Sequence, residues 1–323
     1  MLMFDSAAVD AALSYPALID TLEAAFAKGG IAPPRHHHAI ALDGRPEATL
    51  LLMPAWEARE AGSAFAGRYM GLKSVTVYPD NKARGQPAVL GTYLLMSAGT
   101  GETLAVMDAT RLTAWRTAAA SALASRYLSR PDAARLLIVG AGALASFLVR
   151  AHASVRPIRK VSVWNRSRPR AEALIGELAR AGIAAAIADD LAAAVAEADI
   201  VSTATLSSAP LVRGAWLKPG THLDCVGAFK PSMRETDDEA VRRAHIFVDT
   251  RAGAFAEAGD ILQPLQAGVI GNEAVLGELS DLTRGTVPGR TSPEEITLFK
   301  SVGASIEDLA AAVAVYEHNH QSP

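Results

Sequence analysis

The sequence predicts an α/β protein in which a mixed α+β domain is followed by a doubly wound parallel sheet. From residue 136 onward, short apolar runs alternate with helical patterns, as in a parallel sheet with helices on both faces. Before about residue 110, strand-like runs are separated by turn-rich pieces, which indicates a mostly antiparallel sheet. A chain of 323 residues is long enough for these two domains.

The first domain is expected to begin with a helix from Ser14 to about Lys28, which Gly29 and Gly30 end. A helix over about 112–128 leads out of this domain, and Pro131 follows it. The strands expected between these helices are 49–53, 71–77, 88–96 and 103–108.

The second domain is expected to extend to about residue 290. Its predicted strands are 136–139, 161–164, 184–188, 200–203, 221–226 and 246–248, and its predicted helices are 144–153, 168–181, 191–196 and 237–243. The segment 292–318 has a long apolar helical period, with Pro293 in its first turn, and should return to the first domain. The predicted division is therefore 1–115 with 291–323, and 116–290.

The most informative motif is Gly-x-Gly-x-x-Ala, which follows the apolar strand 136–139 and opens a helix. Gly140 permits a tight turn, Gly142 lets the backbone approach a pyrophosphate, and Ala145 allows close helix–strand packing. The helix N-terminus offers free N–H groups to phosphates. This context predicts a Rossmann-type domain that binds a dinucleotide through Gly140, Ala141, Gly142, Ala143 and Leu144.

The end of the next strand indicates which nicotinamide cofactor is used. An NAD-specific fold places a carboxylate there, roughly 20 residues after the glycines, to bind the ribose 2′-hydroxyl. This chain has Asn165, Arg166 and Ser167, followed by Arg168 and Arg170. Because arginine and serine can bind a 2′-phosphate that a carboxylate would repel, we predict NADPH, with NADH as a weaker substitute.

Composition excludes several classes of protein. The net charge of −3 provides no large field for nucleic acid or an anionic membrane. Cys225 is the single cysteine, which excludes a disulfide framework and fits a reducing compartment. Neither a signal peptide nor an apolar run of membrane-spanning length is apparent, so we expect a cytoplasmic protein.

Two cations in the first domain are candidates for binding an anion. Lys73 lies within an apolar strand, where it either lines a pocket or extends its ammonium to solvent. Arg116 lies among small residues, where it either holds a carboxylate or is a surface arginine. Arg35 precedes three histidines, His36 to His38, but consecutive residues of an extended segment do not converge on one ion, so no metal is expected.

Taken in order, the motifs of this chain resemble those of the ornithine cyclodeaminase/mu-crystallin family. The motifs that carry the resemblance are Pro34-Arg35, Met53-Pro54, Gly71-Leu-Lys73, Leu104-Ala-Val-Met-Asp108, the Thr-Ala-x-Arg-Thr-Ala-Ala block at 113–119, Ile138-Val-Gly-Ala-Gly142, Trp164-Asn-Arg166, Gly214-x-Trp-x-Lys-Pro-Gly220, Gly259-Asp260 and Thr297-Leu-Phe-Lys-Ser-Val-Gly303. They span nearly the whole chain. The resemblance implies a homodimer whose first domain binds substrate and dimerises.

The resemblance also implies roles for individual residues. Arg35, Lys73 and Arg116 match the residues that hold the substrate's α-carboxylate, with Lys73 and Arg116 as the catalytic pair. Arg116 is also expected near the cofactor. The further cofactor contacts implied are Asn165, Arg166, Ser167, Arg170, Thr205, Leu206, Val226, Ala228, Lys300 and Ser301.

Two departures from the cyclodeaminase pattern narrow the expected activity. Cyclodeaminases have an aspartate at the position of Phe229 and a glutamate at the position of Leu51, whereas neither residue here can take a proton from a distal ammonium. Gly-Ala-Phe-x-Pro-x-Met-Arg-Glu at 227–235 resembles the branch that reduces cyclic imino acids. Phe229 is either a wall of the substrate site or a simple packing residue.

The expected enzyme is therefore an NADPH-dependent ketimine reductase of proline metabolism. It would reduce Δ1-pyrroline-2-carboxylate, Δ1-piperideine-2-carboxylate or both, to L-proline or L-pipecolate. The alternatives are an amino-acid dehydrogenase, a cyclodeaminase, or a non-enzymatic NADPH-dependent binding protein of mu-crystallin type.

Overall fold

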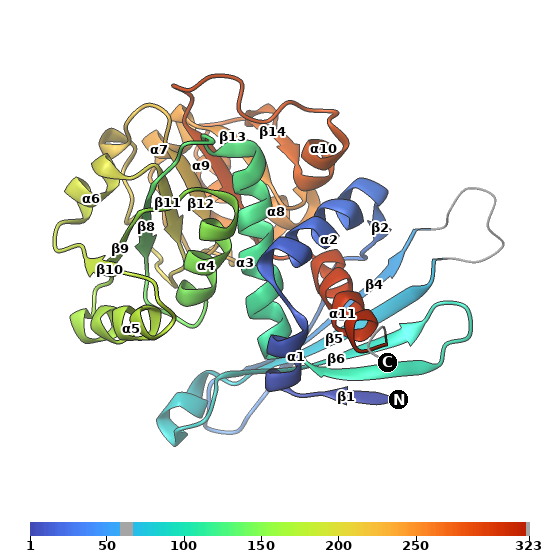
Figure 1. Cartoon of the computed structure of the whole chain (residues 1–323). Helices are drawn as coiled ribbons and strands as arrows, with labels where there is room; N and C mark the ends of the chain where they lie inside the picture. Colours follow the sequence, from blue (N-terminus) through green and yellow to red (C-terminus); the bar gives the residue numbers. More distant parts are fainter. Residues whose placement is uncertain (59–66, 321–323) are drawn as a thin grey trace. The chain divides into compact units, whose positions relative to one another are not determined.

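The computed structural model describes residues 1–58 and 67–320 and confirms the α/β fold class (Figure 1). The chain divides into two compact units, Met1–Arg116 with Ala304–Pro323, and Thr117–Gly303. The first unit holds a mixed sheet and the second a parallel sheet. Residues 291–303, which the sequence placed in the first domain, lie in the second unit.

The sheet of the first unit has the order β1-β7-β6-β5-β4-β2, and β3 also pairs with β4. Every pairing is antiparallel except that of β1 with β7. The strands are β1 (Leu2–Phe4), β2 (Gly30–Ile31), β3 (His36–Ile40), β4 (Ala48–Glu57), β5 (Tyr69–Val77), β6 (Val89–Ser97) and β7 (Thr103–Asp108). The mostly antiparallel sheet expected from the turn-rich sequence is thus present.

Side chains alternate across these strands, so one face of the sheet is buried and the other is not. The buried face includes Met53, Lys73, Tyr93 and Met107, which are mutual cross-strand neighbours. Helix α11 (Ser305–His320) contacts β4, β5 and β6, and it also packs against α1 (Ser6–Ala12) and α2 (Tyr15–Lys28). The opposite face is only partly buried; it carries the apolar residues Leu50, Leu52, Trp56, Met70, Leu72, Leu94 and Met96, together with Ser74, Thr76 and Thr92.

Helix α2 begins one residue after Ser14 and ends at Gly29, as predicted. Ser14 precedes the helix in an extended conformation and makes no side-chain capping hydrogen bond. Gly29 has φ +81°, a left-handed value that glycine adopts without a Cβ penalty. Helix α3 (Ala109–Leu128) begins three residues earlier than expected and contains Arg116.

The second unit is built on an eight-stranded parallel sheet, with the order β10-β9-β8-β11-β12-β15-β13-β14. Its strands are β8 (Arg135–Val139), β9 (Lys160–Trp164), β10 (Ala185–Ile187), β11 (Ile200–Thr203), β12 (His222–Cys225), β13 (His245–Val248), β14 (Val275–Glu278) and β15 (Thr297–Lys300). The chain runs outward from β8 to β10 and then returns to β11 on the other side of β8. Open α/β sheets bind ligands beyond the carboxyl ends of the strands at such a reversal.

Helices cover both faces of this sheet (Figure 1). On one face, alternate strand residues such as Leu137, Val201 and Leu223 form an apolar core, to which α6 (Leu191–Glu197) contributes Val195. The other face carries polar as well as apolar residues and packs against α4 (Ala145–Val155). The remaining helices are α5 (Arg168–Arg180), α7 (Asp238–Arg243), α8 (Arg251–Glu257), α9 (Gly259–Gln266) and α10 (Leu279–Arg284).

The main error of the sequence prediction concerns the segment 292–318. It contains strand β15, fully buried, and only then helix α11, which begins at Ser305. A short apolar run such as Thr297–Lys300 fits a buried strand or a helix equally well by periodicity, and the acidic residues after Pro293 favoured the helix. Strands β1, β2, β3 and β14 and helices α1, α8, α9 and α10 were also not predicted.

Candidate functional site

The glycine-rich loop has the geometry that a bound pyrophosphate requires. Gly140 has φ +111°, and a Cβ at this position would lie 2.8 Å from the Ala204 carbonyl oxygen, so only glycine fits. Gly142 is exposed, and the nearest atom to a Cβ there would be 4.0 Å away. The amides of Ala143 and Leu144 precede the first residue of α4, where no intrahelical acceptor exists. This loop therefore presents open backbone donors at a helix N-terminus.

The loop after β9 holds the glycine-rich loop and exposes basic side chains. Asn165 Oδ1 accepts from the Ala141 amide at 3.1 Å, and its Nδ2 donates to the Ser167 carbonyl at 2.8 Å. Arg168 is paired with Glu172 and Asp189, at 3.1 and 2.6 Å. Arg166 and Arg170 are exposed, and within residues 1–58 and 67–320 their side chains have no ion pair. The basic side chains predicted to bind a 2′-phosphate are thus available at this loop.

In the first unit, the predicted cations Lys73 and Arg116 are both buried, with exposed fractions of 2% and 5%. Lys73 Nζ lies 2.6 Å from Asp308 Oδ2. Arg116 Nε donates to Asp308 Oδ1 at 2.9 Å, and its Nη1 donates to Glu307 Oε2 at 2.7 Å. Two adjacent carboxylates of α11 therefore hold both cations.

The protonation of this cluster follows from burial and from its opposite charges. Burial lowers the pKa of Lys73 to about 8; Asp308 opposes this shift, whereas the nearby charges of Arg116 and Arg35 add to it. Burial opposes the charge of Asp308, but Arg116 and Lys73 nevertheless lower its pKa. Arg35, which is half-buried, is thus close enough to act electrostatically on Lys73. Lys73 and Arg116 therefore form a buried cluster with Asp308 and Glu307, and the charge of Arg35 acts on it.

Carboxyl ends of three strands of the second unit meet at a second charged cluster. Lys300, at the end of β15, is fully buried and lies 3.5 Å from Asp260 Oδ2. Glu235 Oε1 accepts from the amide and the hydroxyl of Thr205, both at 2.7 Å, and its Oε2 accepts from the Thr203 hydroxyl at 2.8 Å. Burial raises the pKa of Glu235 to about 7, with Lys300 opposing and Asp260 reinforcing the shift.

The other predicted site residues lie on loops at this same edge of the sheet. Leu206 is 67% exposed and Phe229 is 40% exposed, whereas Val226, Ala228 and Ser301 are buried. Glu307, Asp308, Glu235 and Asp260 were not identified from the sequence. The only sequence signal for the first two is a pair of acids directly before the apolar run Leu309–Val315.

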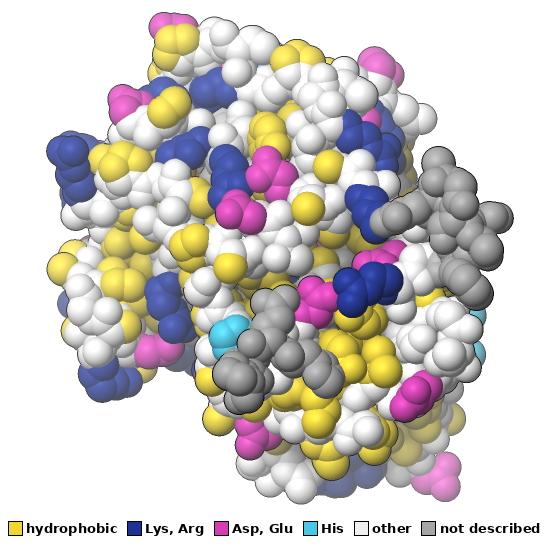
Figure 2. All heavy atoms as spheres, turned by 45° about the vertical axis from the view of Figure 1, so that its right-hand side comes forward, with side chains coloured by type: hydrophobic (Ala, Val, Ile, Leu, Met, Phe, Trp, Pro, Cys, Tyr) yellow, Lys and Arg dark blue, Asp and Glu magenta, His cyan; other side chains and the backbone are white. Residues whose placement is uncertain are grey.

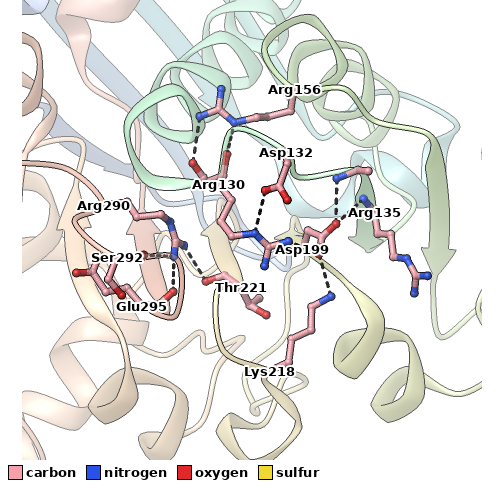
Figure 3. Close-up of polar contacts among 12 residues, drawn as sticks. Arg130, Asp132, Arg135, Arg156, Asp199, Lys218, Thr221, Arg290, Ser292 and Glu295 are labelled. Carbon is pink, nitrogen blue, oxygen red and sulfur yellow. Dashed lines mark hydrogen bonds and ion pairs between the residues drawn. The ribbon is translucent and has the colours of Figure 1, made fainter.

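A hollow of about 630 Å³ in the second unit lies elsewhere and is lined by Glu294 among others, together with Arg130 and Arg290, which Figure 3 shows. It lies at the amino-terminal edge of the sheet, where Asp199 precedes β11. Arg130 and Lys218 both bond to Asp199, at 3.1 and 2.9 Å. Arg290 and Arg156 donate to backbone carbonyls at the C-terminus of α3. The two cations that line the hollow are thus engaged within the protein, Arg130 in an ion pair and Arg290 at the end of α3.

A Ser–His–Asp arrangement inside the second unit is structural. His152 lies 2.9 Å from Ser125 Oγ through Nδ1 and 3.0 Å from Asp224 Oδ2 through Nε2. All three residues have an exposed fraction of 0%, and Ser202 also donates to Asp224 at 2.6 Å. Because no substrate can reach these atoms, the network satisfies buried polar groups.

In the described part of the chain, no three histidine, cysteine or acidic side chains gather as metal ligands. His36 to His38 are exposed on β3, where successive side chains point to opposite faces. Over the same residues, no helix has both the length and the apolar character needed to cross a membrane. Basic and acidic side chains are interspersed on the face drawn in Figure 2.

The sequence profile of the ornithine cyclodeaminase/mu-crystallin family matches residues 1–322. The chain belongs to this family. A Δ1-pyrroline-2-carboxylate reductase of Paracoccus denitrificans is 43% identical over 270 residues, covering 83% of each protein. The family expected from the sequence motifs is thereby confirmed.

Two solved structures share the fold over nearly the whole chain. The Δ1-pyrroline-2-carboxylate reductase of Thermococcus litoralis, in complex with NADH and L-proline, has a TM-score of 0.89 and 33% identity, covering 99% of this chain and 98% of that one. An archaeal alanine dehydrogenase dimer with bound NAD has a TM-score of 0.88 and 32% identity, covering 99% and 96%. These relatives are nicotinamide-dependent oxidoreductases.

Proposed function

We propose that this protein reduces a cyclic imino acid, Δ1-pyrroline-2-carboxylate, Δ1-piperideine-2-carboxylate or both, to L-proline or L-pipecolate with NADPH. The names of its relatives support the enzyme class, a nicotinamide-dependent imine oxidoreductase. The observation that carries the proposal is the cluster of buried cations around Lys73 and Arg116.

The charge of this cluster suits a carboxylate. Lys73 and Arg116 are fixed by Glu307 and Asp308, and Arg35 adds positive charge that acts on Lys73. This concentration of cations would attract a substrate carboxylate. The buried carboxylates fix the two cations before substrate binds, which reduces the ordering that binding must otherwise cost.

The glycine-rich loop and the basic loop after β9 fit a phosphorylated dinucleotide. The open donors at Ala143 and Leu144 suit the pyrophosphate, and the unpaired Arg166 and Arg170 suit a 2′-phosphate. When bound, the reduced nicotinamide supplies the hydride that the imine carbon accepts. The carboxylate clamp orients that carbon, because the C=N bond is adjacent to the carboxyl group.

Phe229 supports a cyclic substrate over ornithine. Its ring is 40% exposed at the position where cyclodeaminases carry an aspartate. An apolar wall favours the methylenes of a ring, and it cannot stabilise a distal ammonium. Ammonia release from ornithine is therefore not expected.

We also propose a homodimer formed through the apolar face of the first unit's sheet. Leu50, Leu52, Leu72 and Leu94 on this face are only partly buried, and contiguous exposed apolar surface of this kind marks an interface. Leu72→Glu should yield a monomer in sedimentation or light-scattering measurements. Leu276→Glu, at an exposed residue of β14, is the control that should leave the mass unchanged.

The lone buried cysteine further fits a reducing, cytoplasmic setting.

The proposed reaction is tested by following NADPH oxidation with each cyclic imine, beside parallel reactions with NADH and with pyruvate plus ammonia. Consumption of NADPH with at least one imine is expected, with a lower rate for NADH. Oxidation with pyruvate plus ammonia alone would replace this proposal with an amino-acid dehydrogenase, the activity of one similar structure. Cofactor binding without turnover of any substrate would favour a binding protein.

A further inference from the structure

The loop that follows β12 combines an unusual backbone conformation with a buried lysine. Ala228 has φ +50°, the one left-handed value at a non-glycine residue within residues 1–58 and 67–320. Such strain persists only where the surrounding structure imposes it, and it is concentrated at functional sites. Phe229, the candidate wall of the substrate site, is the next residue.

The contacts of Lys300 explain how the strained conformation is held. Its Nζ donates to the Cys225 carbonyl at 3.1 Å and also to the Gly227 carbonyl. These are the last residue of β12 and the residue immediately before Ala228. With both carbonyls fixed by one ammonium, the chain has little freedom in how it leaves the strand.

Asp260 and Glu235 complete the support around Lys300. Asp260 Oδ2 faces the ammonium, while its Oδ1 accepts from the amides of Glu235 and Thr236 at 2.8 and 2.9 Å. Glu235 then bonds to Thr205, in the loop after β11. The neighbouring loops are packed closely, since a Cβ on Gly227 would lie 2.3 Å from the Thr205 carbonyl oxygen.

A buried ammonium is costly to desolvate, and a protein with an apolar residue of similar size in its place is often just as stable. Stability alone therefore does not account for Lys300. Its hydrogen bonds are instead directed at the loop that follows β12. This loop lies at the carboxyl ends of the strands, where open parallel sheets bind ligands.

We propose that Lys300 is a positioning residue: it holds the Cys225 and Gly227 carbonyls so that Ala228 keeps its left-handed conformation and Phe229 is presented at the edge of the sheet. This assignment rests on the proposed imine reduction. The family resemblance implied a cofactor contact at Lys300, and the present assignment gives its side chain a role in positioning the loop.

The test compares Lys300→Met with a matched lysine at the opposite edge of the same sheet. Lys218 likewise bonds to a backbone carbonyl, that of Glu197 at 2.7 Å, and to an aspartate, Asp199 (Figure 3). Lys300→Met should accelerate amide hydrogen exchange in residues 226–230 and lower kcat by about 100-fold, the scale of a small misplacement at a reacting centre. The KM for the imine, which the first unit's cations set, should change less than kcat. Lys218→Met should change neither the exchange nor kcat.

A second substitution separates positioning from loss of structure. Glycine adopts the left-handed region without a Cβ penalty, so Ala228→Gly should restore part of the lost kcat when combined with Lys300→Met. If Lys300→Met does not fold, Lys300→Gln is the alternative, because glutamine keeps an N–H donor. It should change hydrogen exchange and kcat in the same directions but by smaller amounts.

Unchanged exchange in residues 226–230 together with unchanged kcat in Lys300→Met would overturn the assignment. So would a loss of kcat that Ala228→Gly does not relieve. The exchange measurement needs no substrate. If the wild-type protein reduced neither imine, the proposed function would fail on its own, and exchange would still decide whether Lys300 holds the loop.

Discussion

Replacing Asp308 with asparagine would remove the anion that Lys73 and Arg116 share. The carboxylate lies 2.6 Å from Lys73 Nζ and 2.9 Å from Arg116 Nε, and all three side chains are buried. Removing one partner of a buried ion pair leaves an uncompensated charge and costs about 3–5 kcal/mol. Since domains are commonly stable by only about 5–15 kcal/mol, the loss should be a large part of the total.

The assay is urea unfolding followed by tryptophan fluorescence, with Glu307→Gln as the matched comparison. Glu307 also lies on α11; it pairs with Arg116 at 2.7 Å and accepts from the Ala304 amide at 3.3 Å, whereas Asp308 bridges two buried cations. Its replacement should therefore destabilise the protein less than Asp308→Asn. The double variant Lys73→Met/Asp308→Asn should be more stable than the sum of the single changes predicts, because neither charge is then left without its partner.

Catalysis provides a second measurement on the same variant. Asp308 raises the pKa of Lys73 against the effect of burial, so its loss should leave Lys73 neutral at neutral pH. The KM for the imino acid should then rise. A free energy of unfolding within about 1 kcal/mol of the wild type, the range of a solvent-exposed pair, would refute the reasoning.

Three further predictions follow from the charges described above. Because the Lys73 pKa is about 8, the KM for the imino acid should increase as the pH rises past that value, as measured by initial rates at constant ionic strength. Arg166→Ala should lower kcat/KM for NADPH by about 10-fold or more through loss of a charge-assisted hydrogen bond, with little change for NADH; Arg168→Ala, at a residue already paired with Glu172 and Asp189, is the control. Burial raises the pKa of Glu235 to about 7, above its value in the unfolded chain, so its contribution to stability is lost as the pH rises toward and through 7. Glu235→Gln should flatten that part of the profile of unfolding free energy against pH, and an unchanged slope would contradict the assignment.

Local signals in the sequence were sufficient for most of the fold. Strands 103–108 and 200–203 have the predicted bounds, because turn residues delimit each apolar run. The glycine motif identified the loop after β8 for a physical reason, since the φ of Gly140 is accessible to few other residues. Strand β15 was missed because its pairing partners, β12 and β13, are distant in sequence. Pairing with distant strands produces no pattern in the local sequence that could be recognised.

The candidate site was predicted only in part, for a similar reason. Lys73 and Arg116 were found because a charge in apolar or small surroundings is unusual. Their partners Glu307 and Asp308 are close to them in space but almost 200 residues from Arg116 along the chain, with separations of 191 and 192. Acids in the first turn of a helix are common enough to be explained by the helix dipole. The contact that makes them important exists only after the chain has folded.

The late position of β15 in the chain has a consequence for biosynthesis. Residues 297–300 come after all the other described strands of this sheet in the sequence, yet they lie between β12 and β13, and His222 pairs with a residue 75 positions further on. Until then β13 and β14 have no sheet to join, and β12 exposes an unpaired edge. Nascent chains should therefore be prone to aggregate or to need a chaperone until β15 has been synthesised, and truncation before residue 300 should prevent the second unit from folding.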